Sequence, residues 1–172
     1  GKITAAQAKM GYVGAFTYAE VISGYTSFYL GAKSVCPTVT MEVQFTGSWY
    51  DEIEEKILSA DIVYAGGGNL KFLMDTWKKT GADKAFKKAY EKGIILSGYS
   101  SGSMCWFAEG YDDCGENHEF MFIECLGLLP YCNCPHYESD YWQPFKEAVK
   151  TRSLTGLAIE NGAAYIWDNG KV

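Results

Sequence analysis

The chain has 172 residues, of which 48% are hydrophobic and 21% charged, and its formal net charge is −6 at pH 7. This length and composition predict one domain with one substantial core and exclude a disordered tail. The net charge is negative and Arg152 is the only arginine, which argues against the clustered Lys and Arg residues that nucleic-acid binding needs. No apolar run is long enough to span a bilayer, so we expect a cytoplasmic protein without nucleic-acid or membrane partners.

The chain opens on Gly1 rather than Met and has no charged-then-apolar leader, so we expect a mature chain or an excised piece. Residues 10–16 predict a short buried strand, and apolar residues at helical spacing from 21 to 29 predict a helix after it. Strict alternation over residues 38–46 indicates a strand at a sheet edge. Residues 51–59 predict a short charged helix.

The remaining elements continue this alternation of strands and helices. A strand at 61–65 ends in a glycine-rich segment, and two helices follow, the first with core positions at Leu70, Leu73 and Trp77. The second helix stops at Gly93. The later elements are a buried strand at 94–96, a polar loop at 109–119, apolar segments near 120–129, a helix near 143–150 and strands at 157–160 and 164–167.

This order of elements predicts an α/β fold, with a doubly wound, mostly parallel sheet of the flavodoxin-like or class I glutamine amidotransferase-like type, in a single domain (1–172). In such sheets ligands bind beyond the carboxyl ends of the strands. Two glycine-rich segments, 66–69 and 98–102, lie at that end of their strands. We therefore expect the functional site where these two segments meet.

The segment G-Y-S-S-G, residues 98–102, fits the G-x-S-x-G nucleophile elbow between a strand and a helix. In this interpretation Ser100 is the nucleophile and the backbone N–H of Ser101 forms half of an oxyanion hole. Gly67 and Gly68 are candidates for the second oxyanion donor, because their N–H groups can converge on an anion. The alternatives are plain glycine-rich turns or, for the first segment, a phosphate-binding loop, although the nucleotide-loop spacings are absent.

A nucleophilic serine needs a base, and His118 and His136 are the only histidines. His118 lies in a polar loop, whereas His136 follows an apolar run and Pro135, a setting that can fix an imidazole or make it purely structural. The base also needs an orienting carboxylate. Glu160 is preferred because it ends an apolar strand. The candidates for this role are Asp112, Asp113, Glu124, Glu138, Asp140 and Glu160.

The cysteines offer a competing interpretation. Cys132, Cys134 and His136 alternate in C-N-C-P-H, and Cys114 and His118 lie upstream in C-G-E-N-H. Thiolates and imidazoles are preferred zinc ligands, but C-x-C is not the usual spacing, and alternate residues on a strand share a face for structural reasons alone. We predict no metal, no other cofactor and six reduced thiols.

Four ordered motifs over about residues 59–167 resemble the peptidase E (aspartyl dipeptidase) and cyanophycinase family of serine peptidases. They are A-D-I-V-Y-A-G-G-G-N, G-Y-S-S-G, L-G-L-L-P-Y-C-N-C-P-H and G-L-A-I-E-N-G-A-A. The resemblance implies hydrolysis of short peptides by a triad of Ser100, His136 and Glu160, with the oxyanion donors given above. It also implies substrate contacts from Asn69 and from Arg152, because peptidase E selects an N-terminal aspartate through a basic residue.

Residues 10–52 are similar instead to a βαβ unit of basic-membrane-protein-type substrate-binding proteins, which bind nucleosides. We therefore predict a chimera, with a binding-protein-like unit at 1–52 and a peptidase E-like core at 57–172. Two alternatives to an active hydrolase follow: an engineered scaffold with a vestigial triad, or a nucleoside binder. The expected assembly is a monomer or homodimer with short peptides as its partners.

Overall fold

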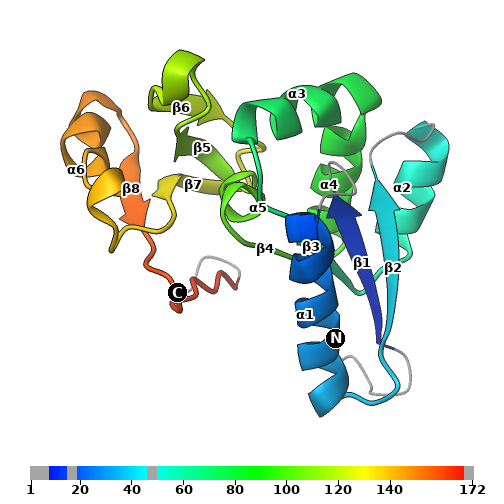
Figure 1. Ribbon diagram of the computed structural model, residues 1–172. Coiled ribbons are helices and arrows are strands. Elements are labelled where there is room, and N and C mark those ends of the chain that lie inside the picture. The colour runs from blue at the N-terminus through cyan, green and yellow to red at the C-terminus, as the bar shows by residue number, and fades with distance from the viewer. Residues whose placement is uncertain (1–7, 15–18, 46–49, 169–172) are drawn as a thin grey trace.

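The computed structural model describes residues 8–14, 19–45 and 50–168 of the chain. It contains two four-stranded sheets, which lie side by side with a short helix between them (Figure 1). The α-helices are α1 (Ala19–Val35), α2 (Tyr50–Leu58), α3 (Leu70–Thr80), α4 (Ala82–Glu91), α5 (Ser101–Met104) and α6 (Phe145–Ala148). Short 3-10 helices cover Glu116–His118, Asp140–Trp142 and Val149–Thr151.

The first sheet has the order β2-β1-β3-β4, and all its strands are parallel. β2 lies at the outer edge of this sheet, which confirms the edge strand predicted from the alternation of residues 38–46. The predicted ends of the first two strands, at residues 15–16 and 46, lie outside the described residues. The strands are β1 (Lys9–Gly14), β2 (Thr40–Phe45), β3 (Ile62–Ala65) and β4 (Ile95–Gly98).

Helices cover both faces of the first sheet. On one face the Tyr25 ring of α1 packs on Tyr12 of β1, with ring centroids 4.9 Å apart. The next residue of β1, Val13, points to the other face. There it joins a core cluster with Ile53 and Ile57 of α2. This two-sided cover is the doubly wound arrangement that the sequence predicts.

The second sheet has the order β6-β5-β7-β8, in which only the β5–β6 pair is antiparallel. The α/β class is confirmed, but the strands form two sheets rather than the one that was predicted. Among the described residues, no strand of the second sheet pairs with β4, so the sheet is interrupted after β4. The strands are β5 (Phe107–Asp112), β6 (Met121–Glu124), β7 (Leu129–Cys134) and β8 (Thr155–Ala158).

Two predicted elements differ from the structure. Residues 109–112, predicted as part of a polar loop, form the end of β5, where Tyr111 and Asp112 are buried. Residues 164–167, predicted as a strand, form no strand, and the single bridge in this stretch lies at Asp168. Trp167 packs its ring on Tyr131, with centroids 5.9 Å apart, so its apolar character serves packing rather than strand pairing.

One core joins the two sheets. Trp77 of α3 and Phe86 of α4 are fully buried and lie with ring centroids 4.3 Å apart. Trp106, just before β5, completes an aromatic triad at 5.3 Å from Phe86. The same core cluster contains Val63 of the first sheet and Ile123 of the second, as expected for one domain.

The six cysteines all lie within the described ranges and form no disulfide there, and four of them are buried. Burial raises the pKa of both Cys132 and Cys134 to about 12. Within the described ranges, no three His, Cys, Asp or Glu side chains are grouped so that they could hold a metal ion. None of the helices described is both long and apolar enough to cross a membrane.

Candidate active site

The strand–helix turn from β4 to α5 places Ser100 in a backbone conformation that side chains rarely adopt, with φ 54° and ψ −129°. The glycines two residues away on either side are required. A Cβ on Gly98 would lie 2.0 Å from the carbonyl oxygen of Gly102, and one on Gly102 would lie 2.1 Å from that of Ala65. The turn therefore has the close backbone approaches of a nucleophile elbow.

His136 lies beside this serine, with its Nε2 3.1 Å from Ser100 Oγ. It comes two residues after β7, so the site joins segments from both sheets. The other histidine, His118, is exposed, and its Nδ1 lies 3.6 Å from a carboxylate oxygen of Asp113. Of the two candidate bases, the structure therefore brings His136 to the serine.

The second ring nitrogen of His136 is held by an amide. Its Nδ1 lies 2.5 Å from Oδ1 of Asn161, which follows β8. Glu160, predicted for this contact, is the preceding residue and is exposed. Its role stays a prediction. Asn161 stands next to Glu160 in the same motif, but the expectation that a carboxylate orients the base does not predict an amide at this place.

Glu138 holds Asn161 in turn. One carboxylate oxygen accepts the backbone N–H of Asn161 at 2.7 Å, and the other accepts its side-chain Nδ2. The Asn161 N–H, with a smaller contribution from His136, lowers the pKa of Glu138 below its ordinary value. Glu138 is one of the six carboxylate candidates from the sequence. In the structure it contacts Asn161, which in turn contacts the imidazole of His136.

The other glycine-rich segment lies against the elbow. The hydroxyl of Ser101 donates to the carbonyl of Gly68 at 2.6 Å, and a Cβ on Gly67 would lie 3.1 Å from Cβ of Ser100. Ser101 is also the first residue of α5, so no carbonyl of that helix can accept its N–H. The segments predicted to build an oxyanion hole are thus adjacent.

Asn69 serves the helix that follows. Its Oδ1 accepts the N–H of Phe72 at 2.8 Å, which caps the N-terminus of α3. The next N–H, of Leu70, donates to the buried carboxylate of Asp112 at 3.0 Å. Burial raises the pKa of Asp112. These two contacts fix the end of the glycine-rich segment, and the predicted substrate contact of Asn69 stays a prediction.

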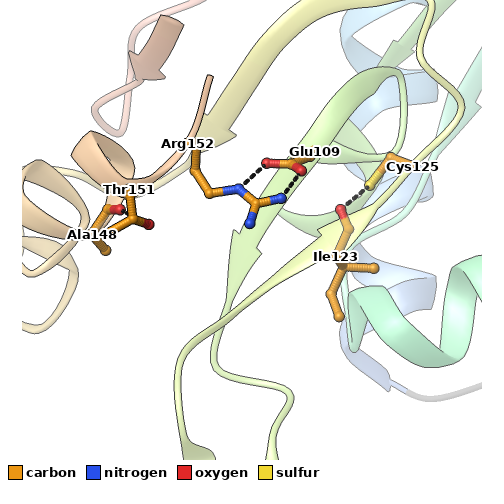
Figure 2. Close-up of polar contacts among 6 residues, drawn as sticks. All are labelled: Glu109, Ile123, Cys125, Ala148, Thr151 and Arg152. Carbon is orange, nitrogen blue, oxygen red and sulfur yellow. Dashed lines mark hydrogen bonds and ion pairs between the residues drawn. The ribbon is translucent and has the colours of Figure 1, made fainter. Parts of the chain in front are cut away.

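Arg152 is paired with a carboxylate of the second sheet. Figure 2 shows its guanidinium facing Glu109 of β5, where Nε donates to one oxygen at 2.8 Å and a terminal nitrogen donates to the other. The guanidinium also lies 5.0 Å from the centroid of the Phe122 ring. The guanidinium is thus paired with a carboxylate of the same chain, and the predicted substrate contact of Arg152 stays a prediction.

Aromatic rings flank the imidazole. The ring centroid of Tyr99 lies 6.4 Å from that of His136, and the centroid of Trp142 lies 5.8 Å from it. Tyr99 is half exposed. The arrangement of a serine, a hydrogen-bonded imidazole and adjacent glycines can support nucleophilic attack on an acyl group.

Comparisons with known proteins agree with this geometry. The sequence profile of peptidase family S51 matches residues 28–172. YgaJ of Bacillus subtilis (strain 168), named an uncharacterized peptidase, is 32% identical over 119 residues, covering 67% of this chain and 51% of that protein. The chain spans about half the length of this relative and of two uncharacterized Listeria peptidases.

A solved structure described as a candidate peptidase E protein from Listeria monocytogenes EGD-e shares the fold. Its TM-score is 0.67 at 19% identity, covering 93% of this chain and 81% of that one. A purine-binding protein of Brucella abortus (strain 2308) is 30% identical over 91 residues, covering 53% of this chain and 24% of that protein. The predicted chimera, with its units at 1–52 and 57–172, stays a prediction. Since the S51 profile covers most of the sequence, the chain belongs to peptidase family S51, the peptidase E family.

Proposed function

We propose that this protein is a serine peptidase that hydrolyses short peptides, with Ser100 as nucleophile and His136 as general base. The observation that carries the proposal is the 3.1 Å contact between His136 Nε2 and Ser100 Oγ at a strained strand–helix turn. Hydrogen-bonded pairs of this kind activate a hydroxyl that is a weak nucleophile by itself. Membership of a peptidase family supports peptides as the proposed substrate class.

In the proposed reaction, Ser100 Oγ attacks the scissile carbonyl carbon while His136 Nε2 takes its proton. Negative charge develops on the carbonyl oxygen, and the N–H groups of Ser101 and of the Gly67–Gly68 segment stabilise it. His136 then gives its proton to the leaving amine. Water then attacks the resulting acyl-enzyme while His136 Nε2 takes a proton from it. The proton passes to Ser100 Oγ as the acyl group leaves.

The third member of the proposed triad, which orients His136, comes from the turn after β8. In the structure Asn161 holds Nδ1, a role that an amide also fills in the Cys-His-Asn variant of the triad. Glu160 remains the candidate carboxylate that the family resemblance implies. Glu160→Gln and Asn161→Ala separate the two, because the residue that orients His136 is the one whose loss lowers kcat.

Turnover tests the proposal. We expect the protein to hydrolyse members of a dipeptide panel, and Ser100→Ala to lower kcat/KM by about 1,000-fold or more. Ser59→Ala, an exposed serine at the end of α2, is the matched control and should leave turnover unchanged. Because Arg152 is held on Glu109, the panel should include Asp-X and neutral X-X substrates. Equal turnover by wild type and Ser100→Ala would remove the assignment.

A further inference from the structure

We propose that Glu138 is a positioning residue that fixes the tautomer of His136 through the side chain of Asn161. The three side chains form one line of hydrogen bonds that ends at Ser100 Oγ. This proposal deepens the proposed function and rests on it, because the tautomer matters only if His136 acts as a base.

The argument starts from what a carboxylate can do. An ionised carboxylate only accepts hydrogen bonds, so the Asn161 atom that faces Glu138 must be the donor Nδ2. The amide is then oriented with its acceptor, Oδ1, toward His136. The nitrogen that meets an acceptor must carry a proton, so His136 is protonated on Nδ1.

This tautomer is the one that general-base catalysis requires. With the proton on Nδ1, the lone pair of Nε2 faces the hydroxyl of Ser100 and can accept its proton. If the amide of Asn161 turned over, its Nδ2 would face His136 and favour the opposite tautomer. Nε2 would then carry a proton and could not act as base. The charge on Glu138 therefore selects the competent form.

The backbone keeps the line in register. His136 and Glu138 follow β7, whereas Asn161 follows the neighbouring parallel strand β8. Beyond the ladder, Ile159 N–H donates to the carbonyl of Cys134 at 2.9 Å, and Tyr137 N–H donates to that of Ile159 at 3.2 Å. The two segments are thus joined on both sides of His136. The lowered pKa of Glu138 is consistent with a carboxylate that stays ionised in this position.

A purely structural role for Glu138 makes a different prediction. Its bond to the Asn161 N–H could simply brace the turn after β8. In that case removing the charge would change stability but not the protonation of the imidazole. The decisive measurement is therefore the tautomer of His136, read from the 15N chemical shifts of both ring nitrogens in protein labelled at histidine.

In wild type we expect His136 to show a protonated Nδ1 and an unprotonated Nε2, with signals assigned by comparison with His118→Asn. In Glu138→Gln, the 15N chemical shifts of both ring nitrogens of His136 should move toward those of the opposite tautomer. The same variant should have a kcat lower by about tenfold or more, with KM within about twofold of wild type. Glu147→Gln, an exposed carboxylate of α6 paired with Lys150, is the matched control and should change neither.

Unchanged His136 shifts in Glu138→Gln would overturn the proposal, as would a wild-type His136 protonated on Nε2. The spectrum separates this from the proposed function. If the shifts move in Glu138→Gln while the wild-type protein hydrolyses no peptide, the positioning role stands and the peptidase assignment fails. If peptides are hydrolysed and the shifts do not change in Glu138→Gln, the peptidase assignment stands and the positioning role of Glu138 fails.

Discussion

Ser100 and His136 share a property that their types do not require. Both have positive φ, and they are two of four non-glycine residues in the described ranges that do. Each such conformation costs about 1–3 kcal/mol and persists only where the surroundings enforce it. At Ser100 the enforcing contacts are the approaches of Gly98 and Gly102 to neighbouring backbone. The two residues that we assign to catalysis are thus placed by strained backbone.

Asp112 gives a residue-scale prediction about pH. Burial raises its pKa, so the folded protein keeps this proton to higher pH than the unfolded chain, whose Asp ionises near about 3.9. Stability is therefore lost as pH rises from that value through the folded pKa. Asp112→Asn keeps an oxygen for the Leu70 N–H and removes the titration. We expect its melting temperature to rise relative to wild type as the pH increases above about 4, and the difference to level off above the folded pKa of Asp112.

Thermal unfolding measured at a series of pH values checks this expectation. Asp75→Asn is the matched control, because Asp75 is an exposed carboxylate paired with Lys71 on the surface of α3. A difference between Asp112→Asn and wild type that stays constant with pH would contradict the account of Asp112.

At the scale of elements, the turn between β4 and α5 tolerates no added atom. A Cβ on Gly102 would meet backbone atoms of Ala65 and Gly66, which cannot move aside as a side chain can. We expect Gly102→Ala to destabilise the protein by about 1–3 kcal/mol and to abolish turnover. Gly31→Ala is the opposite case, because Gly31 lies in α1 with nothing within 4 Å of the added Cβ. It should stabilise by about 0.5–1 kcal/mol.

Denaturant unfolding followed by circular dichroism, together with turnover, checks this pair of variants. A Gly102→Ala protein with wild-type activity would show that the turn is not the rigid support that the structure indicates. A destabilised Gly31→Ala protein would contradict the structure, in which an added Cβ at Gly31 meets no atom within 4 Å.

The sequence predicted those elements whose signals are local. The burial of Leu70, Leu73 and Trp77 follows from helical spacing within one segment, and the structure confirms it. Contacts between distant segments carry no such signal. Asp112 meets Leu70 across 42 positions, and Arg152 meets Glu109 across 43. The division into two sheets and the Glu138–Asn161 contact could not be predicted either, because both depend on segments that are distant in the sequence.

At the scale of the whole molecule, the question is whether a chain of this length holds a working site. It covers about half the length of the peptidases it matches, and the predicted chimera would give residues 10–52 a different parent protein. The proposed catalytic groups come from both sheets, so the shared core must hold them to within about 0.5 Å for catalysis. A scaffold that misplaced them would keep the fold and lose the chemistry. The predicted alternative, a vestigial triad, is this case.

Labelling with a fluorophosphonate probe, followed by intact-mass and peptide mass spectrometry, decides between a working and a vestigial site. Because the probe reacts only with an activated serine, it reports the Ser100–His136 pair without any assumption about the substrate. We predict one equivalent of label on wild type, located on Ser100, and none on Ser100→Ala, with Ser59→Ala labelled as wild type. Absence of label on wild type, or equal labelling of Ser100→Ala, would contradict the claim that Ser100 is the nucleophile.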